Sequence, residues 1–62
     1  MDVRIMKALA RREYNAWGRF SRLALQADAR REHLDAVELR EIAQRHLEAH
    51  RKADAVSREG TA

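Results

Sequence analysis

The chain contains no cysteine and no proline, and among its 62 residues there are only two glycines and three aromatic residues. The lack of cysteine excludes disulfides and thiolate metal sites, and the lack of proline removes the residue that interrupts helices most strongly. No apolar run approaches the roughly 18 residues of a membrane span, and the start of the chain lacks the regions of a secretory signal. We therefore expect a cytoplasmic protein with no membrane span.

The residues that are present suit a small, ordered domain. Hydrophobic residues make up 45% of the chain and are evenly spaced, which argues against disorder for its body. With 62 residues the chain is one domain at most, and a single core of this size rarely supplies more than about 3–5 kcal/mol. Because no disulfide can add stability, we expect the chain to associate with itself or to fold against a partner.

The first half of the chain predicts one long helix. Asp2 is suited to cap it, because its side chain can accept a hydrogen bond from a free amide of the first turn. The apolar residues that follow recur at steps of three and four and form one broad face: Ile5, Met6, Leu9, Ala16, Trp17, Phe20, Leu23, Ala24 and Ala27. Gly18 does not shift this phase, so we predict a helix over residues 3–30. The alternative is a break at Gly18 with Ser21 capping a new helix, which would give three helices.

The second half carries a distinct helix-start signal. It combines the spacing of a capping box with that of a hydrophobic staple, formed by Asp35, Glu38, Leu34 and Leu39. We therefore predict a turn over residues 31–34 and a second helix over residues 36–55. Residues 57–62 are expected to form a frayed tail, so the hairpin domain covers residues 1–56.

A connection this short allows only antiparallel neighbours, so the predicted fold is all-α, an antiparallel two-helix hairpin. Its apolar faces are wider than one helix can cover, especially around Met6, Trp17 and Phe20, and two hairpins paired as a four-helix bundle would cover the excess. In length, turn position and the long first helix, the hairpin is similar to the Rop-type plasmid RNA-binding proteins, although it shares no sequence motif with them. The resemblance implies a dimeric four-helix bundle that uses the outer face of its first helices to bind RNA.

Few residues suggest chemistry. His46 and His50 have the i,i+4 spacing that lets two imidazoles hold one metal ion, but a zincin needs Glu at the position of Leu47. We interpret both as interface histidines. Glu13 is the one carboxylate on the apolar face of the first helix, and we expect it to pair with His50 or Arg51 as a register-setting contact. We predict no catalytic residues, no metal or other cofactor and no small-molecule substrate.

Basic charge is concentrated in the first half of the chain. Residues 1–31 carry eight Lys and Arg against three acids, whereas residues 32–62 carry five against seven, which indicates an anionic partner. The predicted partner-binding residues follow helical spacing on the outer face of the first helix: Arg4, Lys7, Arg11, Tyr14, Asn15, Gly18, Arg22 and Leu25. Arginine beside tyrosine is common at interface hot spots and also stacks on bases.

We therefore predict a non-enzymatic regulatory protein, a homodimer, that docks on an acidic protein surface through this face. Structured RNA is the alternative partner. A solvated face without a partner and an anionic membrane surface are further interpretations of the same residues.

Overall fold

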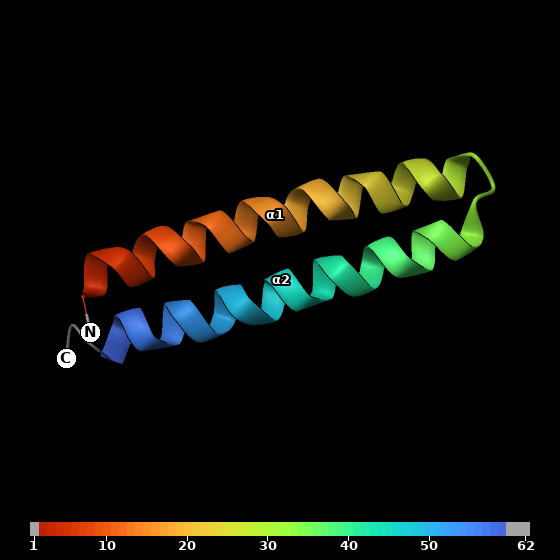
Figure 1. The fold of residues 1–62 in the computed structure, drawn as a ribbon. Helices are drawn as coiled ribbons and strands as arrows, with labels where there is room; N and C mark the ends of the chain where they lie inside the picture. The colour runs from red at the N-terminus through yellow and green to blue at the C-terminus, as the bar shows by residue number, and fades with distance from the viewer. Residues whose placement is uncertain (1, 60–62) are drawn as a thin grey trace.

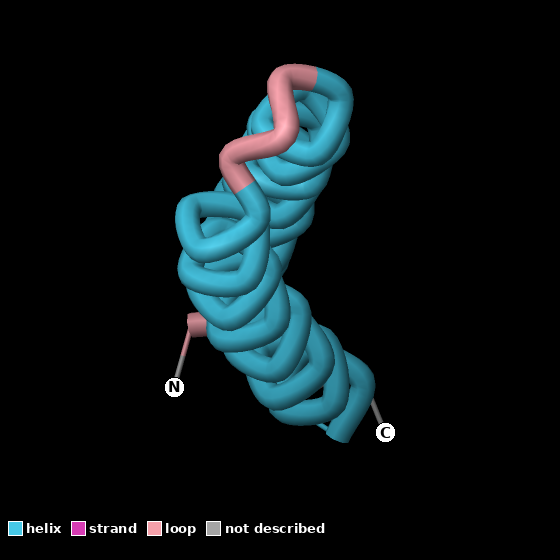
Figure 2. The backbone as a smooth tube through the Cα atoms, turned by 90° about the vertical axis from the view of Figure 1, so that its right-hand side faces the viewer, coloured by secondary structure: helices cyan, strands magenta, loops and turns pink. Residues whose placement is uncertain are grey.

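The computed structural model describes residues 2–59 and folds them into two helices, α1 (Val3–Ala29) and α2 (His33–Glu59). The helices run antiparallel and lie side by side (Figure 1). The hairpin is 47 Å long and measures 13 by 12 Å across its Cα positions. A view rotated by 90° shows the short connection that joins α1 to α2 (Figure 2). The predicted all-α hairpin is therefore confirmed.

α1 begins and continues as its sequence predicts. The Asp2 carboxylate accepts a hydrogen bond from the Arg4 amide at 2.9 Å, so Asp2 is the N-cap. The helix runs through Gly18 without a break, which rules out the three-helix alternative. The unbroken apolar phase accounts for this, because a kink would turn half of that face away from α2.

The end of α1 contains one residue in the left-handed conformation, Arg31, with φ of 63°. The Arg31 amide donates to the Asp28 carbonyl at 3.0 Å, and the Glu32 amide donates to the Ala27 carbonyl at 2.9 Å. This pair of bonds is a Schellman motif, which satisfies the last carbonyls of the helix. The chain therefore reverses within residues 30–32, rather than over the predicted turn at 31–34.

α2 begins three residues earlier than predicted. The Ala36 amide donates to the Glu32 carbonyl at 3.0 Å, so Glu32 holds the N-cap position and Asp35 already lies inside the first turn. The predicted capping box is wrong because the Schellman turn brings the chain into helical conformation directly at His33. Leu34, predicted to form a staple, is 83% exposed.

α2 also ends later than predicted. It continues to Glu59, so residues 57–59 of the predicted tail are helical, and residues 60–62 lie outside the described part of the chain. Ser57 is buried against α1, and Arg58 forms an i,i+4 ion pair with Asp54 at 3.1 Å. A cation in the last turn also interacts favourably with the helix dipole, which stabilises this end.

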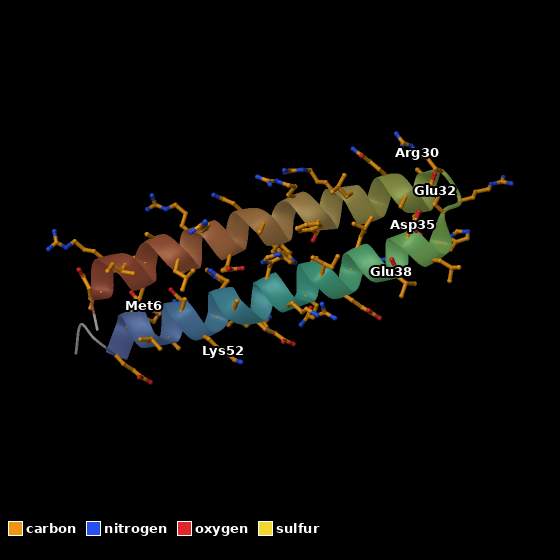
Figure 3. The ribbon with its side chains drawn as sticks, viewed as in Figure 1. Met6, Arg30, Glu32, Asp35, Glu38 and Lys52 are labelled. Carbon is orange, nitrogen blue, oxygen red and sulfur yellow. The ribbon has the colours of Figure 1, made fainter. Side chains whose placement is uncertain are left out.

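The interior between the helices consists of small side chains. The buried residues of the described chain are Ala10, Ala24, Ala27, Ala36, Ala43, Ala53 and Ser57. Small side chains at a contact let two helices pack closely, and this leaves no room for large side chains on the line between them. Met6 still points from α1 toward α2, whereas Lys52 points away from α1 (Figure 3). Most of the large apolar side chains consequently lie at the flanks of the hairpin, where they keep part of their surface exposed.

Candidate binding surfaces

A partly buried acid–imidazole pair joins the middle of the two helices. Oε2 of Glu13 lies 2.5 Å from Nδ1 of His46. His50, the predicted partner of Glu13, instead donates from Nδ1 to the Ala10 carbonyl at 2.8 Å. The predicted Glu13–His50 pair is wrong because the helix register places His50 one turn further along, level with Ala10. The polar contact itself is present, with a different histidine.

The two histidines have separate surroundings. The His46 ring is stacked on Phe20, with an angle of 8° between the rings and 5.4 Å between their centroids. The His50 ring lies 5.3 Å from the ring of Tyr14 on the other flank. Each imidazole is thus held by a different group of α1.

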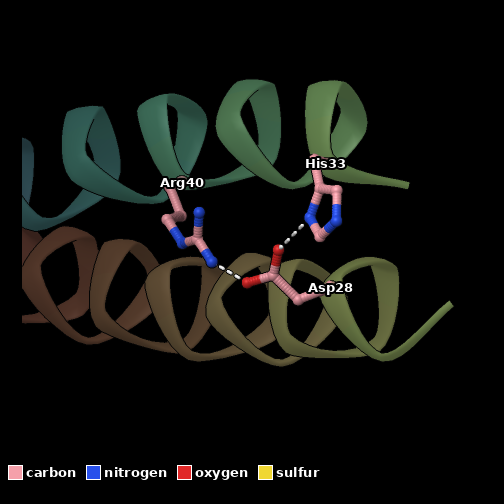
Figure 4. Close-up of polar contacts among 3 residues, drawn as sticks. All are labelled: Asp28, His33 and Arg40. Atoms are coloured by element: carbon pink, nitrogen blue, oxygen red, sulfur yellow. Dashed lines mark hydrogen bonds and ion pairs between the residues drawn. The ribbon is translucent and has the colours of Figure 1, made fainter. Parts of the chain in front are cut away.

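A second acid of α1 is neutralised near the turn. Asp28 pairs with Arg40 of α2 through one carboxylate oxygen, and its other oxygen lies 3.4 Å from Nδ1 of His33 (Figure 4). Glu13 and Asp28 are the only acids between Val3 and Ala29. Both carboxylates of α1 are therefore occupied by side chains of α2.

The cations of α1 are not compensated in the same way. Six Lys and Arg residues lie in α1: Arg4, Lys7, Arg11, Arg12, Arg19 and Arg22. Within residues 2–59, none of them forms an ion pair. All six side chains are exposed. α1 therefore presents a surface of net positive charge to its surroundings.

The predicted partner-binding residues occupy adjacent rows along α1. Seven-residue steps connect Arg4, Arg11, Gly18 and Leu25 in one row, and they connect Lys7 with Tyr14 and Asn15 with Arg22 in the rows beside it. Lys7, Arg11 and Tyr14 also line one groove between the helices, together with His50 and Asp54 of α2. We call this surface, with all eight residues, the basic face.

Tyr14 has a structural contact as well as an exposed one. Its ring lies 5.3 Å from the rings of both Trp17 and His50, while the residue is 50% exposed. The sequence pattern placed Tyr14 away from the hairpin contact. The contact with His50 was not predicted, because it depends on which residues of α2 lie level with Tyr14.

The opposite side of the hairpin is an apolar face. Leu23 and Ala27 of α1 line a groove with Leu39 and Ile42 of α2. Seven-residue steps from these positions extend the same side toward the other end of the hairpin, through Leu9, Ala16 and Phe20 of α1 and Ala49 and Val56 of α2. Leu9 and Leu23 are 38% and 39% exposed. We call these nine residues the apolar face.

No helix in the described part of the chain, residues 2–59, is long and apolar enough to cross a membrane. Comparison of the chain with models of known protein families, with curated proteins and with solved structures yields no match.

Proposed function

We propose that this protein is a non-enzymatic binding protein that regulates an acidic protein by docking on it through the basic face of α1. One observation carries the proposal. α2 occupies both carboxylates of α1, through His46 and Arg40, and leaves the six cations of α1 without an ion-pair partner inside the described chain. Four of the six, Arg4, Lys7, Arg11 and Arg22, lie on the basic face. Uncompensated cations on one side of a protein attract an anionic surface and raise the rate of encounter with it.

The composition of the basic face favours a protein over a nucleic acid. Asp54 of α2 lies in its groove beside Lys7 and Arg11 but pairs with Arg58, which lines the same groove, so the groove as a whole stays basic. Leu25, 68% exposed, adds an apolar contact that a protein surface can bury. Arginine and tyrosine at the same surface are the residues most enriched at protein–protein hot spots.

The proposal is tested by affinity capture from host extract with the full chain. The wild-type protein should retain an acidic protein, and treatment with nuclease should leave that retention unchanged. Replacing Arg11→Glu and Arg22→Glu together should weaken the capture by more than about tenfold, or about 1.4 kcal/mol. The matched control is Arg51→Glu, which reverses an exposed cation of α2 that lies outside the basic face, and it should bind normally.

RNA as the partner would give a different set of results. Nuclease would then abolish capture, and the affinity for an RNA hairpin would fall steeply and linearly with salt on logarithmic axes. Equal losses for Arg51→Glu and for the α1 variant would show that only overall charge matters. Either outcome would refute docking on a protein through the basic face.

A further inference from the structure

We propose that the apolar face is covered by a second copy of this chain, in a dimer whose two turns lie at the same end. In this arrangement α1 of each copy packs beside α2 of the other. The alternative symmetric arrangement places the turns at opposite ends and packs α1 against α1. The two arrangements bury the same residues, but they bring different charges together.

The hairpin alone leaves several large apolar side chains partly uncovered on one side. Its buried residues are alanines and one serine, while Leu9, Leu23, Ile42 and Phe20 keep part of their surface exposed on one side. The hairpin is 47 Å long. A face of that length and two helices wide, roughly 20 Å, has an area of the order of the ~800 Å² that each partner contributes to a stable interface. Because the chain has no cysteine, no disulfide can add stability to so small an interior.

In the same-end arrangement the apolar faces of the two copies meet without any shift of one hairpin along the other. Its twofold axis runs parallel to the helices, so each residue of α1 meets α2 of the partner at the level it already has within its own hairpin. Within the hairpin, Phe20 is level with His46, and Leu23 shares a groove with Ile42. Leu23 therefore lies beside the partner's Ile42, and Ala16 lies beside the partner's Ala49.

The same register extends to both ends of the face. Leu9 comes to lie beside the partner's Val56. At the turn end, the groove is lined by Arg30 and by three acids, Glu32, Asp35 and Glu38 (Figure 3). The same-end arrangement brings Arg30 beside the partner's Asp35, and the symmetry repeats this contact of opposite charges.

Charge distinguishes the two arrangements. α1 carries six Lys and Arg against two acids, whereas α2 carries five against six. Arg12 and Arg19 follow Leu9 and Ala16 by three residues and border the apolar face on the α1 side. Turns at opposite ends would set these arginines against the same arginines of the partner, in rows that contain no acid.

The border of the apolar face on α2 is different. It carries Arg45 and Lys52, and each of these follows an acid by four residues, Glu41 and Glu48 respectively. In the same-end dimer Arg12 and Arg19 are level with the partner's Lys52 and Arg45, and the two acids of that border lie among these cations. Like charges that face each other across an interface oppose association. The two acids of the α2 border offset part of that repulsion, whereas the arginine rows of the other arrangement contain no acid, so the same-end dimer is the favoured one.

The arrangement has a consequence that rests on the proposed function. The two α1 helices lie at diagonal corners of the bundle, so their basic faces point to opposite sides. One dimer then offers two separate docking surfaces, and it can bind two acidic partners at once.

The test uses spin labels, because the chain has no cysteine and a single one can be introduced cleanly. Leu34→Cys places a label at an exposed position near the turn, and Glu59→Cys places one at the other end. In the same-end dimer, pulsed electron paramagnetic resonance should give label distances below about 30 Å at both sites, since neighbouring helices lie only about 8–10 Å apart. Turns at opposite ends would separate both label pairs by more than about 40 Å, the length of a 27-residue helix. Such long distances, or a monomer mass by sedimentation, would overturn the proposal.

A matched pair of variants locates the interface. Leu23→Glu places a charge on the apolar face and should raise the dimer dissociation constant by more than about tenfold. Leu25→Glu is the control, since Leu25 lies on the basic face, and its dimer should persist. A Leu23→Glu dimer of normal stability, or equal dissociation of both variants, would overturn the assignment of this face. A wild-type monomer that instead binds a synthetic acidic amphipathic peptide would show that another chain covers it. The label distances are measured on chains that keep Leu23, so they do not depend on whether Leu23→Glu folds.

Discussion

Oε2 of Glu13 on α1 lies 2.5 Å from Nδ1 of His46 on α2, and this contact ties together the middle of the hairpin. The side chains of the two residues are only 22% and 31% exposed, and Phe20 stacks on the imidazole. If either residue is removed, the other keeps a partly buried polar group without its partner. Leaving such a polar group unpaired lowers the free energy of unfolding by more than the contact itself contributes to it.

Glu13→Ala and His46→Ala should each lower the free energy of unfolding by about 1–3 kcal/mol for that reason. The double variant should lose less than the two single losses together, with a coupling energy of about 0.5–3 kcal/mol. Urea unfolding followed by circular dichroism, at one fixed protein concentration, measures all three. Glu13→Ala combined with His50→Ala is the control and should be close to additive, because His50 bonds to the Ala10 carbonyl. Additive losses for Glu13 and His46 would refute the pairing.

The alanine interior makes the hairpin sensitive to added volume. Ala36 is 0% exposed, so Ala36→Leu should force the helices apart and destabilise the protein by about 1–3 kcal/mol. Ala55→Leu adds the same atoms at an exposed position of the same helix and should stay within about ±0.5 kcal/mol. Thermal unfolding of the two variants makes the comparison. If Ala36→Leu were tolerated as well as Ala55→Leu, the close contact at Ala36 would be wrong.

The turn contains a residue that glycine would suit better. Arg31 holds φ of 63°, a conformation that costs a residue with a side chain about 1–2 kcal/mol. Glycine loses part of that advantage through the entropy of the unfolded chain, so Arg31→Gly should stabilise the protein by up to about 1 kcal/mol. Arg30, with φ of −89°, is the control, and Arg30→Gly should give no gain. Chemical denaturation of both variants decides the point, and a loss of stability for Arg31→Gly would contradict the Schellman turn.

Gly18 lies inside α1, where the helix does not require it. A Cβ atom built at this position meets nothing within 4 Å. Gly18→Ala should therefore raise the free energy of unfolding by about 0.5–1 kcal/mol, since alanine is the better helix former. If the basic face needs a flat surface at Gly18, the same variant should bind the acidic partner more weakly while it unfolds at a higher temperature. A variant that is less stable than the wild type would mean that something crowds this position.

Tyr14 should contribute to stability and not only to binding. Its ring contacts those of Trp17 and His50, and aromatic pairs contribute about 0.5–1.5 kcal/mol beyond the area they bury. Tyr14→Ala should lose at least that much stability in urea unfolding, whereas Tyr14→Phe keeps the ring and should lose little. Equal stability of Tyr14→Ala and the wild type would show that the ring contacts carry no energy.

The sequence by itself determined that there are two helices and that they pair antiparallel, and it identified part of the side of α1 that faces α2. Each of these depends on neighbours within a few residues. Asp2 caps the helix through an amide two residues away. The apolar steps of three and four predicted the burial of Ala24 and Ala27, but they also included Ile5, which is 64% exposed, and missed Ala10, which is buried. The phase that continues through Gly18 favoured an unbroken helix in the same local way, and the structure confirms it.

Only the tertiary structure decided where α2 begins, which histidine meets Glu13 and which side chains fill the interior. Arg31 carries no glycine-like signal for a left-handed turn, so the competing signal at Asp35 placed the start of α2 three residues too late. The partner of Glu13 depends on how far the helices are displaced along each other. That displacement follows from the turn geometry and from the fit of alanines such as Ala36 and Ala43 against α1. A helical pattern repeats every turn, so several registers satisfy it about equally well, and only close packing between the helices selects one of them.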